Sequence, residues 1–158
     1  MSLHSPITII SYEDQYAAVF RDINLEWLNK YHLAESHDLM VLNDPRGTII
    51  GTGGCIFLAM DGTQVVGSAA LIKEHEEGVF ELAKMTVVNS HQGRGISKLL
   101  LKRCIDEAQA LGARRLTLFS NHQLQTALKL YEQFGFHHIP VEDSPFETAD
   151  VKMELLLK

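Results

Sequence analysis

The chain has 158 residues, of which 46% are hydrophobic and 22% are charged. This composition supports a packed core and excludes extensive disorder, and the length fits one domain, so we expect a single domain over residues 1–158. The formal net charge of −6 disfavours nucleic acid or an anionic membrane as the main partner, because both attract a basic surface.

Targeting and metal-binding signals are not apparent in the sequence. No apolar run approaches the roughly 20 residues that span a bilayer, and the start MSLHSPITII lacks the pattern of a signal peptide. Cys55 and Cys104 lie far apart and form neither a CxxC pair nor a zinc-binding spacing, so we interpret both as reduced core thiols. The sequence therefore predicts a cytoplasmic protein without a metal site.

The first 54 residues predict one strand and two helices. Residues 7–12 are rich in β-branched side chains and predict a short strand. Apolar residues recur at helical spacing over about residues 15–31, and a shorter helix is expected around residues 36–42, before Pro45. We expect residues 45–54 to form a loop or a weakly specified hairpin.

The remaining pattern combines a β-meander with a β-α-β crossover. Strands are expected at 54–60, 64–73 and 79–88, separated by turns at Asp61-Gly62 and Gly78. A long helix over about 95–111 ends at Gly112, and a helix over 124–134 ends at Gly135. The other predicted strands are 114–120, 136–141 and 151–158. This order indicates an α/β or α+β fold with a mixed sheet.

The turn HQGRGISKLL, between the third meander strand and the long helix, is a candidate anion site. The N–H groups at a helix N-terminus are unpaired and carry partial positive charge, and glycines let a ligand approach them. Gln92, Arg94 and Lys98 add donors and charge. Gly-x-Gly alone is also typical of an ordinary strand-to-helix turn. The Rossmann fingerprint fails because Lys98 occupies the third glycine position, and the P-loop pattern fails as well.

A third pattern fits this turn. QGRGIS resembles the Gln/Arg-x-x-Gly-x-Gly/Ala signature of the GNAT superfamily of N-acetyltransferases, with Ser97 as a departure at the last Gly/Ala position. Residues 81–121 resemble the core strand, pyrophosphate loop, long helix and following strand of that family. TALKLYEQFGF resembles its next helix, and the resemblance extends over nearly the whole chain.

The resemblance implies an acyl-CoA N-acyltransferase fold with about seven strands in a mixed sheet and about four helices. Acetyl-CoA would lie in a V-shaped split between two central parallel strands. Its pantetheine arm would pair with Met85, Thr86 and Val87. The residues expected around its pyrophosphate are Gln92, Gly93, Arg94, Gly95, Ile96, Ser97 and Lys98. Asn121 is expected either to contact the CoA arm or to cap a helix.

Glu81 is the first candidate catalytic residue. Alternation along the strand places Glu81 with Val79, Ala83, Met85 and Val87, and a carboxylate in such an apolar row needs an explanation. It is either a general base, acting through a water, or a structural carboxylate with a partner. Lys84 would point to the opposite face with Phe80 and Leu82 unless a β-bulge intervenes. We interpret Lys84 as structural or as part of a site for an acidic substrate.

Tyr131 is the second candidate catalytic residue. It matches the tyrosine that, in the family it resembles, can protonate the departing CoA thiolate. The alternative is a core position, because Leu128, Leu130 and Phe134 lie on the same helix. Many relatives carry an Asn seven residues before this Tyr, where this chain has Leu124.

The leading hypothesis is direct transfer of acetyl from acetyl-CoA to a primary amine, in a ternary complex without a metal. A small-molecule acceptor is preferred to a peptide or protein, and a homodimer is common among the proteins that the chain resembles. The alternative is a non-catalytic acyl-CoA-binding regulatory module on the same fold. Candidate acceptor-site residues are Trp27, Tyr31, His32, Glu35, Phe146 and Glu147.

Overall fold

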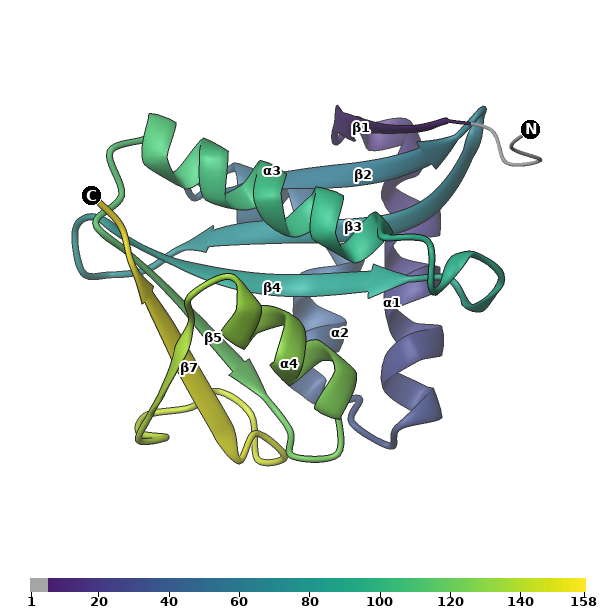
Figure 1. Ribbon diagram of the computed structural model, residues 1–158. Helices are drawn as coiled ribbons and strands as arrows, with labels where there is room; N and C mark the ends of the chain where they lie inside the picture. The colour runs from purple at the N-terminus through teal and green to yellow at the C-terminus, as the bar shows by residue number, and fades with distance from the viewer. Residues whose placement is uncertain (1–5) are drawn as a thin grey trace.

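The computed structural model describes residues 6–158, which form a seven-stranded mixed sheet with the strand order β1-β2-β3-β4-β5-β7-β6 (Figure 1). Residues 1–5, part of the segment for which no signal peptide is expected, lie outside the described residues. No helix within residues 6–158 is long and apolar enough to cross a bilayer.

The N-terminal elements are close to those predicted, except at residues 45–54. They are β1 (Ile7–Ser11), η1 (Asp14–Tyr16), α1 (Ala17–Lys30), α2 (Ser36–Asn43) and η2 (Arg46–Ile50). The expected loop or hairpin is wrong, because η2 is a π-helical turn. The Asp44 carboxylate accepts the N–H of Gly47 at 3.1 Å, and Ile49 is fully buried. A capping carboxylate and a core side chain therefore favour a helical turn here.

The later elements follow the predicted order. They are β2 (Cys55–Asp61), β3 (Gln64–Lys73), β4 (Val79–Val87), η3 (Asn89–His91), α3 (Ile96–Ala110), β5 (Arg115–Ser120), α4 (Gln125–Gln133), β6 (His137–Ile139) and β7 (Val151–Leu156). Strands β1 to β4 are antiparallel neighbours, and β4 pairs with β5 in parallel. β7 inserts between β5 and β6 and is antiparallel to both.

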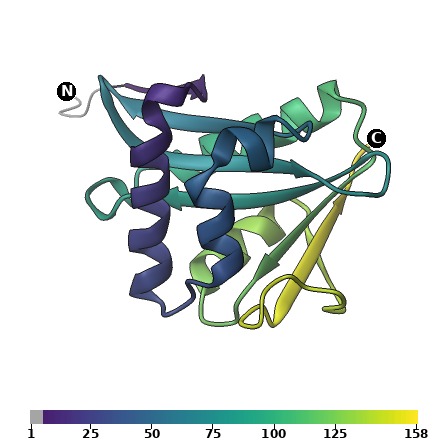
Figure 2. The same ribbon diagram turned by 180° about the vertical axis from the view of Figure 1, so that it is seen from behind.

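The sheet separates two hydrophobic cores. Helices α3 and α4 cover one face, and α1 and α2 cover the other (Figures 1 and 2). Phe57 and Ala59 of β2 pack in the core on the α3 side, whereas Ile56 and Leu58 pack in the core on the α1 side. Alternation along a strand buried on both faces explains why this part of the sequence is almost continuously apolar.

The two cysteines are free thiols, and both are associated with the core on the α3 side. Cys104 is fully buried, and Cys55 is partly buried against the same cluster. Burial, with a smaller effect of Glu107, raises the pKa of Cys55 to about 11, so this thiol is protonated at neutral pH.

The sheet splits between its two central parallel strands. Only residues 79–81 of β4 pair with residues 115–117 of β5. Beyond Glu81 and Thr117 the two strands diverge, as their ribbons show in Figure 1. The predicted V-shaped split is therefore present, and Glu81 stands at its apex.

A β-bulge in β4 changes which side chains share a face. The register between β3 and β4 shifts after Ala83, and Lys84 has a φ of 52°. The predicted grouping of Met85 and Val87 with Glu81 is therefore wrong, because both pack in the core on the α3 side. The β-bulge considered as an alternative is present, and it turns the Lys84 side chain toward α2.

Candidate functional site

A cavity of about 650 Å³ occupies the split. Its walls come from β4 and β5, from α1, α3 and α4, and from the loop that precedes β7. Since β4 and β5 have separated here, side chains and backbone of both strands reach the same space. The site has two ends: one at the N-terminus of α3 and one between α1, α2 and the loop before β7.

At the first end, the glycine-rich turn and the N-terminus of α3 line the cavity. Gly93 and Gly95 have φ of 78° and 77°, values that L side chains rarely adopt, and Gly95 is the N-cap of α3. No side chain caps the first N–H groups of α3. Lys98 and Lys129 also line the cavity. Free N–H groups, a helix dipole and two lysines suit a phosphate group.

The side chains of this turn do not all contribute as expected. Gly93, Gly95, Ile96 and Ser97 line the cavity, whereas Arg94 does not. Gln92 lines the cavity, but its amide donates to the Val87 carbonyl at 3.2 Å and to Asn89 Oδ1 at 3.3 Å. The Gln92 side chain therefore closes the turn.

The second half of β4 presents an open strand edge to the cavity. Met85, Thr86 and Val87 line it, and β5 no longer pairs with them. Apart from the Val87 carbonyl, which accepts the Gln92 amide, backbone groups on this edge that lack a strand partner can bind an extended ligand as an additional strand would.

Asn121 lines the cavity and holds a neighbouring loop. Its amide donates to the Thr148 carbonyl at 2.7 Å, and its Oδ1 accepts the N–H of Gln123 at 3.1 Å. Its interpretation as a helix cap is wrong, because α4 begins at Gln125 with Leu124 as N-cap. Leu124 is apolar and cannot cap α4 with its side chain, so the turn before it is stabilised by Asn121 instead.

Glu81 is 8% exposed and lines the cavity. Burial raises the pKa of its carboxyl to about 7, Glu74 adds to this effect, and Lys84 and Lys152 oppose it. No hydrogen bond to the Glu81 carboxylate is found among residues 6–158. At neutral pH this group therefore interconverts readily between acid and base, as a proton-transfer residue must.

Tyr131 lies on the α4 wall of the cavity and also packs in the core. Its ring contacts that of Phe136, with centroids 5.8 Å apart. Burial, with a small effect of Cys104, raises the pKa of the Tyr131 hydroxyl, so the group is a proton donor at neutral pH. The core position expected as the alternative is confirmed, and Tyr131 also lines the cavity, while its role as proton donor to the CoA thiolate stays a prediction.

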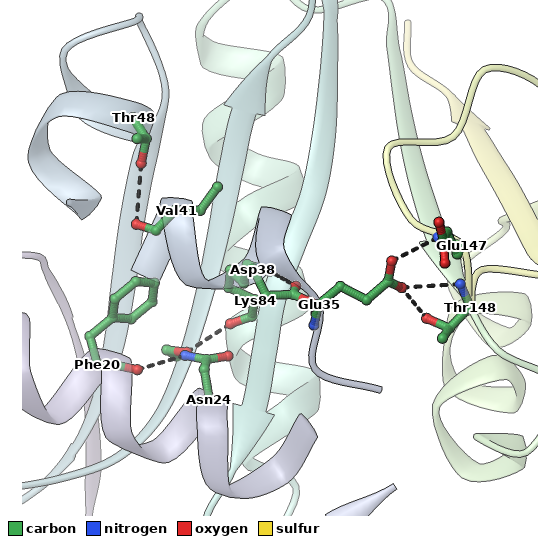
Figure 3. A network of polar contacts seen from close by, with 10 residues as sticks. Phe20, Asn24, Glu35, Asp38, Val41, Thr48, Lys84, Glu147 and Thr148 are labelled. Atoms are coloured by element: carbon green, nitrogen blue, oxygen red, sulfur yellow. Dashed lines mark hydrogen bonds and ion pairs between the residues drawn. The ribbon is translucent and has the colours of Figure 1, made fainter. Parts of the chain in front are cut away.

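At the second end of the cavity, a buried ion pair joins Lys84 to Asp38 of α2 (Figure 3). Their side chains are 6% and 3% exposed. The second oxygen of Asp38 accepts the N–H of Glu35 at 2.9 Å. Asn24 of α1 donates to Ser68, whose hydroxyl donates to the Lys84 carbonyl at 2.7 Å and so supports the bulge.

Glu35 fastens the loop before β7 to the start of α2 (Figure 3). Its carboxylate accepts the N–H groups of Glu147 at 2.8 Å and of Thr148 at 3.0 Å, and also the Thr148 hydroxyl. Burial opposes ionisation, but these three hydrogen bonds outweigh it and lower the pKa of Glu35. The tethered loop places the Phe146 ring against the Lys84 ammonium, 5.4 Å from the ring centroid.

The structure brings together part of the expected acceptor site. Trp27, Tyr31 and Phe146 line the cavity. His32, Glu35 and Glu147 do not, and the Glu35 carboxylate instead binds the backbone N–H groups of Glu147 and Thr148. Sequence reasoning missed Asp38, which lies three residues after Glu35. The capping-box spacing of two acidic residues at the start of α2 is the signal that could have indicated it.

A split sheet with a helix N-terminus at one end of its cavity and ionisable side chains at the other has a geometry suited to an extended ligand that carries phosphate. The model of the acetyltransferase (GNAT) family matches residues 11–136, and the chain belongs to this family.

Individual relatives agree with this assignment. Over 89 residues the chain is 33% identical to N-acetylaspartate synthetase of Xenopus tropicalis, covering 56% of this chain and 33% of the relative. The chain thus matches about a third of the length of that relative. It is 29% identical over 118 residues to an uncharacterised N-acetyltransferase, YjgM, of Escherichia coli, covering 75% and 62%.

Solved structures share the fold. A GNAT acetyltransferase of Staphylococcus aureus superposes with a TM-score of 0.88 at 23% identity, covering 97% of this chain and all of that one. Spermidine N-acetyltransferase of Vibrio cholerae, solved with CoA and spermine, gives 0.72 at 21% identity, covering 95% of each chain.

Proposed function

We propose that the protein is an acetyl-CoA-dependent N-acetyltransferase that acetylates the primary amine of a small molecule. The observation that carries this proposal is the single cavity into which the N-terminus of α3, Glu81 and Tyr131 all open. A module that only binds acyl-CoA needs the helix N-terminus but neither proton-transfer group, so the cavity favours the enzyme.

The residues of the first end fit acetyl-CoA. Uncapped N–H groups at Gly95 and beyond suit the pyrophosphate, with Lys98 nearby. The open edge at Met85, Thr86 and Val87 suits the amide groups of the pantetheine arm. Bound there, acetyl-CoA would supply an activated thioester for acetyl transfer.

Glu81 and Tyr131 divide the proton transfers between them. Glu81 takes a proton from the acceptor ammonium, through a water, so that the amine nitrogen can form the new C–N bond. Tyr131 donates its hydroxyl proton to the sulfur as the C–S bond breaks. Two substrates held in one cavity need no covalent enzyme intermediate, which supports direct transfer in a ternary complex.

The acceptor is proposed to be a small amine, because α1, α2 and the tethered loop line the second end of the cavity and limit the room there. Two of the proteins named above bear names that refer to an amine, aspartate in one and spermidine in the other. These two amines carry opposite net charge, so the names support an amine acceptor without choosing its class.

Two measurements test the proposal. Acetyl-CoA should raise the melting temperature by mass action, and no shift at millimolar ligand would remove the cofactor assignment. A panel of primary amines should then give acetyl-CoA-dependent release of free thiol. Binding of acetyl-CoA without thiol release from any amine would support the non-catalytic module instead.

A further inference from the structure

The carboxylates at the acceptor end of the cavity are almost all engaged with the protein. Asp38 uses one oxygen for Lys84 and the other for the N–H of Glu35. Glu35 uses its oxygens for the loop at Glu147 and Thr148. Of these carboxylates, only Glu81 has no hydrogen bond within residues 6–158, and the proposed reaction requires it for the amine that reacts.

The ammonium of Lys84, unlike these carboxylates, has more hydrogen-bonding groups than the protein engages. An ammonium has three N–H donors. Within residues 6–158, Asp38 is its only hydrogen-bond acceptor, and one further direction faces the Phe146 ring. At least one N–H of this side chain, which is 6% exposed, is therefore engaged by neither Asp38 nor Phe146, and Lys84 lines the cavity.

We propose that the Lys84 ammonium, held by Asp38 and Phe146, binds a carboxylate of the acceptor, so that the acceptor is a small amino acid. This inference rests on the proposed function and names its substrate class. Glu81 and Lys84 are three residues apart on β4, about 10 Å of strand at most, and both reach the same cavity. Amine and carboxylate therefore belong to one compact molecule.

Two other readings of the same residues explain less. A polyamine acceptor needs a second carboxylate for its second ammonium, but the charge of Asp38 is already paired with Lys84, and Glu35 does not line the cavity. A purely structural ion pair would leave the remaining N–H donor of Lys84 to water in the cavity and would give it no part in binding the acceptor. A substrate carboxylate satisfies that donor and adds a charge-assisted hydrogen bond.

The first test needs only the unmodified protein. Small amino acids are compared with their carboxamides, for example glycine with glycinamide and β-alanine with its amide, in the thiol-release assay. Amidation removes a negative charge and lowers the pKa of the amine, so the amides offer more free amine at a given pH. A charge-assisted hydrogen bond should nevertheless give the acids an advantage of about 10- to 100-fold in kcat/KM.

Variants assign the preference to Lys84. The pair Lys84→Met with Asp38→Asn removes both charges together and keeps an oxygen for the Glu35 N–H, and its acid-to-amide ratio should fall to near one. Lys84→Arg retains the cation and should keep the ratio above about tenfold. The thermal shift of each protein with CoA and either compound gives a readout besides turnover.

The outcomes separate this inference from the proposed function. Equal use and equal binding of acids and amides, or an acid preference that survives in the double variant, would overturn the role of Lys84. The role of Lys84 would also be overturned if the protein neither acetylated nor bound any amino acid. If simple amines or diamines still gave thiol release, the acetyltransferase proposal would nevertheless stand. No thiol release with any amine would remove the acetyltransferase itself.

Discussion

Replacing Glu81 by Gln should make the folded protein more stable above neutral pH. Burial raises the pKa of Glu81 from 4.5 to about 7, so the folded state holds the proton more tightly than the unfolded state. Each pKa unit of difference between the folded and unfolded states corresponds to about 1.36 kcal/mol, so ionising this carboxyl disfavours the folded state by about 3 kcal/mol. That penalty is absent below pH 4.5, develops as the pH rises and is complete above pH 7.

The assay is urea unfolding of both proteins at pH 4.5, 6 and 8. Glu81→Gln should match the unmodified protein at pH 4.5 and exceed its unfolding free energy at pH 8 by up to about 3 kcal/mol. Glu77→Gln, at an exposed position in the turn between β3 and β4, is the matched control and should show no such trend. A stability difference that does not change with pH would refute the burial argument.

The same substitution should abolish the acidic limb of the activity profile. In the unmodified protein kcat/KM should fall as the pH drops through about 7, because protonated Glu81 cannot accept the proton of the amine. Glu81→Gln should lose about 10²- to 10⁴-fold in rate and show no limb near that pH. An acidic limb that persists unchanged in the variant would assign the base to another group.

Three further substitutions test separate parts of the site. Tyr131→Phe should lower kcat about 100-fold with unchanged acetyl-CoA affinity in a binding titration, because it removes only the proton donor; unaffected turnover would contradict the general-acid role. Gly95→Ala should lower the unfolding free energy by about 1–2 kcal/mol through backbone strain and weaken acetyl-CoA binding. Gly62 has a similar φ of 62° and equally open space around an added Cβ, but it does not line the cavity. Gly62→Ala should therefore lower the unfolding free energy by a similar amount and leave the affinity for acetyl-CoA unchanged. Glu35→Gln should raise KM for the acceptor more than for acetyl-CoA in steady-state kinetics, since it loosens the loop at Thr148; equal changes in both would place the tether outside acceptor binding.

The elements that could be predicted are those whose signal is local. The meander strands and the helix after the glycine turn follow from apolar periodicity, turn residues and terminating glycines, all within a few residues of one another. The π-helical turn at Arg46–Ile50 could not be predicted in this way. Its stability depends on the Asp44 carboxylate and on a core that α1 and β2 build around Ile49.

The site was predictable where it is made of backbone and less so where it depends on pairing. The glycine turn and its helix follow from residue types alone. The positions of Lys84 and Met85 depend on a bulge that arises from pairing with β3. The alternation of apolar and polar residues along β4 does not predict this bulge. Asp38 and Glu35 act through partners 46 and more than 100 residues away, which no local pattern indicates.

The short pairing of β4 with β5 gives this sheet two additional edges in its interior. Exposed edges of a sheet invite pairing with other chains and promote aggregation, and proteins usually protect them with charges, bulges or covering segments. Here the inner edge of β4 carries a bulge and is enclosed by α4 and by the loop that Glu35 retains. The features that shape the substrate cavity thus also shield an unsatisfied strand from other proteins, and a substitution that frees this loop would endanger solubility as well as activity.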